Sequence, residues 1–119
     1  MMRLRQIALV GKDLDAIRAD VVDVLGLGEA YDDPGVGRYG LRNQVWPIGD
    51  TFLEVVSPKQ PGTTAGRLID KRGGDGGYMA IFQVRDIGAA RALLEQAGAR
   101  TVSQVDRDGV HYSHIHPFG

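Results

Sequence analysis

Cysteine is absent from this chain of 119 residues. Without thiols the protein can have no disulfide, no cysteine nucleophile and no cysteine-ligated metal. Any chemistry therefore falls to His, Glu, Asp, Tyr, Arg and Lys. An excess of charge is absent too, because 14 Lys and Arg face 15 Asp and Glu and the formal net charge is −1. This balance gives no reason to expect a nucleic acid or an anionic membrane as partner.

Long apolar runs are also missing. No stretch approaches the roughly eighteen residues of a membrane span, and the amino terminus, MMRLRQIALV, lacks the apolar core and cleavage site of a signal peptide. We therefore expect a cytoplasmic protein with no membrane partner. A chain of 119 residues with 43% hydrophobic residues is long enough for one core and too short for two independent ones.

One element of the sequence occurs twice. Residues 6–25 (QIALVGKDLDAIRADVVDVL) and 79–98 (MAIFQVRDIGAARALLEQAG) align at an offset of 73, which brings Asp13 onto Asp86. In each copy a short β-rich run precedes an aspartate, an amphipathic stretch and a glycine, which is the order strand, N-cap, helix, C-cap. Apolar residues at i, i+3, i+7 and i+10 form one stripe on each predicted helix: Leu14, Ile17, Val21 and Val24, then Ile87, Ala90, Leu94 and Ala97.

The segments around the two helices predict β-structure. Gly49-Asp50 and Asp108-Gly109 are turn signals, so each indicates a hairpin. Thr64 to Lys71 predicts a short helix, and the glycine cluster 73–77 predicts a flexible connector because it lacks the Lys-Ser/Thr of a phosphate-binding loop. The expected strands are 7–10, 28–33, 38–46, 51–57, 80–84, 100–105 and 110–116.

Two groups of residues are candidates for chemistry. Glu54 lies inside an otherwise apolar strand and needs a partner there, so it is either functional or paired with Arg42 or Arg38. Strand alternation places His114, His116 and Tyr112 on one face and His111 on the other. Two same-face histidines can share a metal, here with Glu54 as a third ligand, or they can line a polar pocket or face solvent.

The quoted repeats, extended to IALVGKDLDAIRADVVDVLGL, FLEVVSP and MAIFQVRDIGAA, resemble the vicinal oxygen chelate superfamily. That superfamily includes glyoxalases, methylmalonyl-CoA epimerases, extradiol dioxygenases and bleomycin-resistance proteins. The resemblance implies an α+β glyoxalase-like domain of paired βαβββ modules that form a cup-shaped mixed sheet. Module one would span 1–62, the connector 63–77 and module two 78–119. The offset places the last strand of module two near 123–130, so that strand is expected to be missing here.

The resemblance also implies a metal site, whose ligand positions fall at Gln6, Glu54 and Met79 and at a position beyond Gly119. Only Glu54 keeps a strong ligand for a hard divalent metal. The usual ligand set is therefore expected to be absent, and the cofactor stays unidentified, with a divalent metal on Glu54 left open.

Two functions follow from the resemblance. The first is an enzyme of the lyase, isomerase or dioxygenase type that acts on a small oxygenated metabolite, with Glu54 and His114 catalytic and a set of substrate-binding residues. The second is a metal-free binding protein of the bleomycin-resistance type. Either would take a small-molecule ligand. We also expect a homodimer, because strand 110–116 carries no proline or lysine to protect a free edge. The expected substrate-binding residues are Gln6, Trp46, Met79, Tyr112 and His116.

Overall fold

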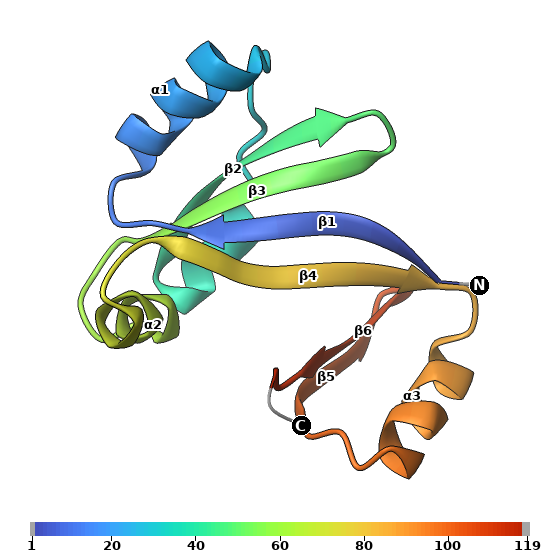
Figure 1. Cartoon of the computed structure of the whole chain (residues 1–119). Coiled ribbons are helices and arrows are strands. Elements are labelled where there is room, and N and C mark those ends of the chain that lie inside the picture. Colours follow the sequence, from blue (N-terminus) through green and yellow to red (C-terminus); the bar gives the residue numbers. More distant parts are fainter. Residues whose placement is uncertain (1, 118–119) are drawn as a thin grey trace. The chain divides into compact units, whose positions relative to one another are not determined.

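The structure of the protein, a computed structural model, describes residues 2–117 and has an α+β fold (Figure 1). Its described residues form two compact units, Leu4–Phe82 and the rest, residues 2–3 and 83–117. No helix among the described residues is both long and apolar enough to cross a membrane. The elements in chain order are β1 (Met2–Val10), α1 (Leu14–Leu25), the 3₁₀ helix η1 (Pro34–Tyr39), β2 (Leu41–Ile48), β3 (Thr51–Pro58), α2 (Thr64–Arg72), β4 (Gly76–Val84), α3 (Ile87–Gln96), β5 (Thr101–Arg107) and β6 (Val110–Ile115).

Four strands form a mixed sheet in the order β2-β3-β1-β4. β1 runs parallel to β3, with Ala8 beside Glu54, and β2 runs antiparallel to β3, with Val45 beside Glu54. The predicted hairpin at Gly49-Asp50 is confirmed, since β2 and β3 pair from Ile48 and Thr51 onward. Glu54 therefore lies on a central strand.

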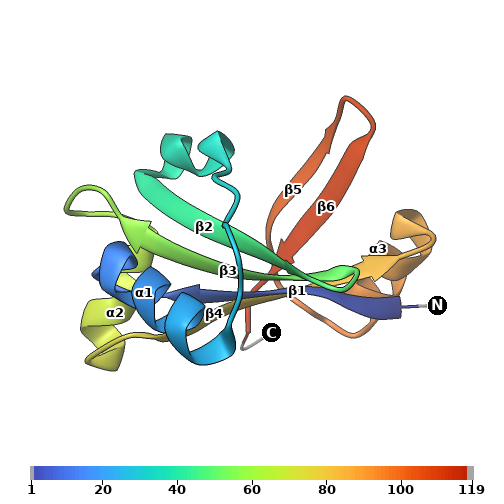
Figure 2. The same cartoon turned by 90° about the horizontal axis from the view of Figure 1, so that it is seen from above.

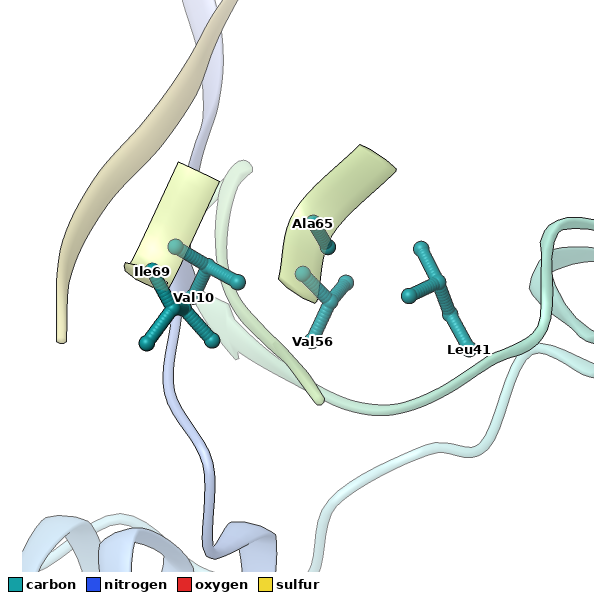
Figure 3. Packing of buried hydrophobic residues seen from close by; sticks show 5 residues of the cluster. All are labelled: Val10, Leu41, Val56, Ala65 and Ile69. Atoms are coloured by element: carbon teal, nitrogen blue, oxygen red, sulfur yellow. The ribbon is translucent and has the colours of Figure 1, made fainter. Parts of the chain in front are cut away.

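The two faces of this sheet bury different helices. α1 packs Leu14 and Val21 against Trp46 and Val55 on one face. α2 lies on the other side of the sheet (Figure 1). Figure 3 shows its Ala65 and Ile69 pointing toward apolar side chains of three strands, Val10, Leu41 and Val56. Since side chains alternate along a strand, Glu54 shares the face of Val56 and not the face under α1.

The second unit contains α3 and the antiparallel hairpin of β5 and β6 (Figure 2). Its turn uses two positive φ angles, 54° at Asp108 and 77° at Gly109, as the Asp-Gly signal predicted. Arg91 of α3 holds the hairpin: its guanidinium donates to the Ser113 hydroxyl at 2.9 Å, to the Asp106 carboxylate at 2.9 Å and to the Tyr112 carbonyl at 3.0 Å.

The predicted helix boundaries are confirmed at their caps. Asp13 and Asp86 accept from the backbone N–H groups three residues ahead, Ala16 at 3.1 Å and Ala89 at 2.9 Å. Gly26 closes α1 with a left-handed φ of 66°. The local sequence signals thus predicted where both helices begin and where α1 ends. α3 ends with Ala97 as its C-cap, and Gly98 follows with a left-handed φ of 71°.

Several predicted strand bounds needed correction, among them that of β1, which begins at Met2 and not at residue 7. Residues 28–33 do not form a strand; only Tyr31 makes an isolated bridge, to Val45. The strand predicted over 38–46 begins at Leu41, because Asp33 caps the 3₁₀ helix η1 and Gly40 ends it with a φ of 70°. Farther along, the cluster 73–77 is divided: Gly73 closes α2, and β4 begins at Gly76.

Candidate functional site

Glu54 is a nearly buried carboxylate, 9% exposed. Its Oε1 accepts from the Gln6 side-chain amide of β1 at 2.9 Å, and its Oε2 accepts from the Asn43 side-chain amide of β2 at 2.6 Å. Both donors are uncharged amides, one on each neighbouring strand. The sheet therefore fixes the carboxylate from two sides and supplies no neutralising cation in these two contacts.

Asn43 is itself held in one orientation. Its Oδ1 accepts from the backbone N–H of Asp33 at 3.0 Å, and its side chain is buried. An N–H group can only donate, so it selects the oxygen end of the amide and leaves the Nδ2 end for Glu54. The turn at Asp33, which also caps η1 through Gly35 N–H at 2.9 Å, is thus connected to the carboxylate.

Tyr78 of β4 is a titratable residue that the charge of Glu54 influences. It packs against the cluster that contains Val10 and Ile69. Burial raises the pKa of Tyr78 above its ordinary value of 10.0, and the charge of Glu54 and the nearby Tyr39 raise it further. The phenol therefore stays protonated through the neutral range and remains an O–H donor.

The arginine partners that the sequence offered for Glu54 are wrong. Arg42 pairs with Asp15 of α1 at 3.2 Å, and the Arg38 guanidinium lies 5.4 Å from the centre of the Tyr39 ring. Alternation explains the first result, since Arg42 and Asn43 are successive residues of β2 and point to opposite faces. Glu54 is held by amides and not by an ion pair.

The structure unites some of the predicted site residues and separates others. Gln6 contacts Glu54. Trp46 does not share their face, because it is 1% exposed under α1 and its indole N–H donates to the Gly28 carbonyl at 3.2 Å. Met79 is half-buried beside Tyr78 in β4, so those two side chains point to opposite faces.

Sequence reasoning missed Asn43 and Tyr78 as members of the site. Asn43 carried a usable signal: it is a polar residue on the face of β2 whose other predicted members, such as Leu41 and Val45, are apolar. Tyr78 carried none, because its role depends on how β4 lies in the sheet.

The histidine strand, β6, belongs to the other unit. The rings of Tyr112 and His114 lie 5.3 Å apart between centroids, so these residues share a face as predicted. His111 points to the opposite face, where its Nδ1 lies 2.8 Å from the Asp106 carboxylate. His116 follows β6 and its backbone N–H donates to the Arg100 carbonyl at 2.9 Å.

Asp106 gives this unit a pH dependence. The hydrogen bond with His111, reinforced by those from Arg91, lowers the pKa of Asp106 from 3.8 to about 2. A lowered carboxylate pKa contributes stability above pH 3.8 that is lost as the pH falls toward 2.

We expect urea unfolding to show this loss of stability between pH 4 and 2 in the wild type and a smaller loss in Asp106→Asn. Asp108→Asn removes a carboxylate from the adjacent turn and should keep the wild-type profile; equal profiles for wild type and Asp106→Asn would contradict the prediction.

The surroundings of Glu54 do not fit the divalent metal that the resemblance implies. Hard metals need converging oxygen lone pairs or imidazoles, whereas both Glu54 oxygens face N–H donors from Gln6 and Asn43. Among residues 2–117 no three His, Asp or Glu side chains are arranged to hold a metal ion.

An open groove of about 660 Å³ runs beside the edge strand β2. Asn43 and Asp33, which are joined by the hydrogen bond that orients the Asn43 amide, both belong to its lining. Its other charged residues are of both signs and select no ligand charge: Asp15, Arg18, Glu29, Asp32, Arg42 and Lys59.

Known proteins share both the sequence pattern and the fold. An ethylmalonyl-CoA/methylmalonyl-CoA epimerase of Cereibacter sphaeroides is 29% identical over 102 residues, which cover 84% of this chain and 74% of the relative. A methylmalonyl-CoA epimerase solved with methylmalonyl-CoA and NH₄⁺ superposes with a TM-score of 0.83 at 21% identity, over 99% of this chain and 87% of that one. The Mycobacterium tuberculosis methylmalonyl-CoA epimerase gives 0.79 at 21% identity, over 97% and 79%.

These likenesses in structure confirm the predicted α+β fold with its mixed sheet. The family profile described as a glyoxalase-like domain matches residues 7–117, nearly the whole chain. The chain therefore belongs to the glyoxalase-like domain family, within the vicinal oxygen chelate superfamily that its repeated motifs resemble.

Proposed function

We propose that this protein is an isomerase that moves a proton on the carbon next to the carbonyl of a small acyl thioester, with Glu54 as the general base. The observation that carries the proposal is the nearly buried Glu54 carboxylate, held between the Gln6 and Asn43 amides. Supporting it, the Cereibacter sphaeroides relative is named an epimerase of ethylmalonyl-CoA and methylmalonyl-CoA.

The position of Glu54 suits proton abstraction from carbon. Low exposure excludes water, which strengthens electrostatic interactions at the carboxylate. Amide donors on both sides restrict its rotation, and a positioned base is more effective than a mobile one. The same sheet face continues past Gln6 to Leu4, which is 43% exposed and offers apolar surface for an alkyl group.

The proposed reaction removes one proton from the substrate carbon and returns one to it. Glu54 takes the proton from the substrate carbon, and the electron pair of that C–H bond moves into the carbonyl to give an enolate. A proton from solvent then adds to the opposite face of the carbon and inverts its configuration, while the proton held by Glu54 passes to solvent and restores the carboxylate. Tyr78, whose raised pKa keeps its hydroxyl protonated, is the neighbouring O–H group suited to donate a hydrogen bond to the developing oxyanion.

Deuterium exchange tests the proposal directly. Purified protein is incubated in D₂O with methylmalonyl-CoA or ethylmalonyl-CoA, and mass spectrometry follows deuterium entry at the carbon between the two carbonyls. Exchange above the rate without protein supports the proposed chemistry. If the protein neither binds these two thioesters nor promotes deuterium exchange into them, the proposal is overturned for this substrate class.

A metal-free binding protein is the second candidate. Gln6 favours it, because its Nε2 turns toward Glu54 at 2.9 Å and thus satisfies the carboxylate from within the protein. Calorimetry with the same thioesters, combined with metal analysis of the purified protein, separates the two functions. Tight binding without deuterium exchange would favour sequestration over catalysis.

We also propose that the protein is a homodimer. Among the described residues β6 pairs with β5 alone, and Val110 at its start is 55% exposed. Exposed strand edges pair readily with other chains, and a two-fold interface covers the same edge in both copies.

Sedimentation at micromolar concentration should give twice the chain mass of 12.9 kDa. Placing a lysine in the edge, as in Tyr112→Lys, should shift the protein toward monomer; a wild type that sediments as a monomer would refute the dimer.

A further inference from the structure

The amide of Asn43 connects the turn before η1 to the proposed catalytic carboxylate. Its Oδ1 accepts from Asp33 N–H at 3.0 Å and its Nδ2 donates to Glu54 Oε2 at 2.6 Å. Asn43 is 4% exposed, so water cannot readily replace either partner. We infer that Asn43 is a positioning residue, oriented by the Asp33 turn, that sets the angle of the Glu54 carboxylate.

The two amides around Glu54 differ in how firmly they are fixed. Among the described residues the Gln6 amide is held by Glu54 alone, so it can turn over and follow the carboxylate. The Asn43 amide is fixed at its other end by a backbone group that itself belongs to a capped turn. Asn43 is therefore the rigid reference, and Gln6 adapts to it.

The chain provides a matched control at the next position. Gln44 also joins β2 to this turn, through a hydrogen bond from its Nε2 to the Asp32 carboxylate. It points to the other face of the strand and does not touch Glu54. Gln44→Leu therefore removes a hydrogen bond to the turn and leaves the contacts of the Glu54 carboxylate in place. Asn43→Leu removes a hydrogen bond to the turn and also one to the carboxylate.

The inference rests on the proposed function for its kinetic arm and not for its structural arm. In crystal structures of the ligand-free variants, the Glu54 carboxylate should leave its wild-type orientation in Asn43→Leu and keep it in Gln44→Leu. An unmoved carboxylate in Asn43→Leu would overturn the positioning role, even if the protein proved inactive toward every thioester.

The kinetic arm uses whichever thioester the wild type exchanges. We expect Asn43→Leu to lower kcat by about 10- to 100-fold with KM near the wild-type value, and Gln44→Leu to stay within about threefold of wild type in both constants. A higher KM with unchanged kcat would show that Asn43 contacts substrate instead, against the inference. Circular dichroism checks folding, and Asn43→Ser, which also ends short of Glu54, replaces the leucine variant if that variant fails to fold.

Discussion

Glu54→Gln should lower the rate of deuterium exchange into the thioester by about 10²- to 10⁴-fold, the range that a general base contributes. The amide that replaces the carboxylate has nearly the same shape but cannot accept the substrate proton at neutral pH. The loss should fall on kcat, since the contacts that bind the acyl group stay in place. Exchange rates at saturating and limiting thioester measure both constants.

The structure also indicates that this variant should fold. In this variant the new NH₂ group of residue 54 would face the side-chain NH₂ group of either Gln6 or Asn43, and two donors cannot form a hydrogen bond with each other. The Gln6 amide can turn its oxygen toward the new NH₂, because Glu54 is its partner within the described residues. Thermal unfolding of Glu54→Gln should therefore stay close to wild type, with a cost of at most about 1–2 kcal/mol. A well-folded Glu54→Gln that exchanges at the wild-type rate would rule out Glu54 as the base.

The sequence predicted the local backbone conformation correctly at Asp13, Gly26 and Asp108. Each takes a conformation dictated by its own neighbours, as an N-cap, a left-handed C-cap and a hairpin turn. Such features are local, so spacing and residue type predicted them. Residues 28–33 show the limit: Tyr31 and its neighbours have strand propensity, yet the Asp33-Pro34 turn competes and leaves a single bridge.

In the candidate site, too, the sequence predicted single residues but not the contacts between residues that lie far apart in the chain. Glu54 stood out because a carboxylate in an apolar strand is unusual, and Gln6 was reached through the family resemblance. Their contact at 2.9 Å, however, depends on the parallel register that places Ala8 beside Glu54. Register joins residues that lie far apart in the chain, so the sequence around Glu54 could not identify Gln6 as its hydrogen-bond partner.

For Trp46, the sequence could not decide whether the side chain lies in the hydrophobic core or lines the substrate pocket. It was expected to bind substrate, and the register places it beside Leu53, on the face that packs against Leu14 and Val21 of α1. Glu54 lies beside Val45 and therefore on the opposite face. A residue in the Trp46 position should affect stability and leave substrate binding unchanged.

We therefore expect Trp46→Ala to lower the free energy of unfolding by about 3–5 kcal/mol, because it empties a large volume in a closely packed cluster. Trp46→Phe keeps most of that volume and loses the indole hydrogen bond to the Gly28 carbonyl, so a loss of about 1–2 kcal/mol is expected. Urea unfolding monitored by circular dichroism measures both. The KM of Trp46→Phe for the exchanged thioester should match wild type, since its side chain and Glu54 are on opposite sides of the sheet. A raised KM with unchanged stability would instead assign Trp46 to the substrate pocket and would mean that β2 presents its other face to α1.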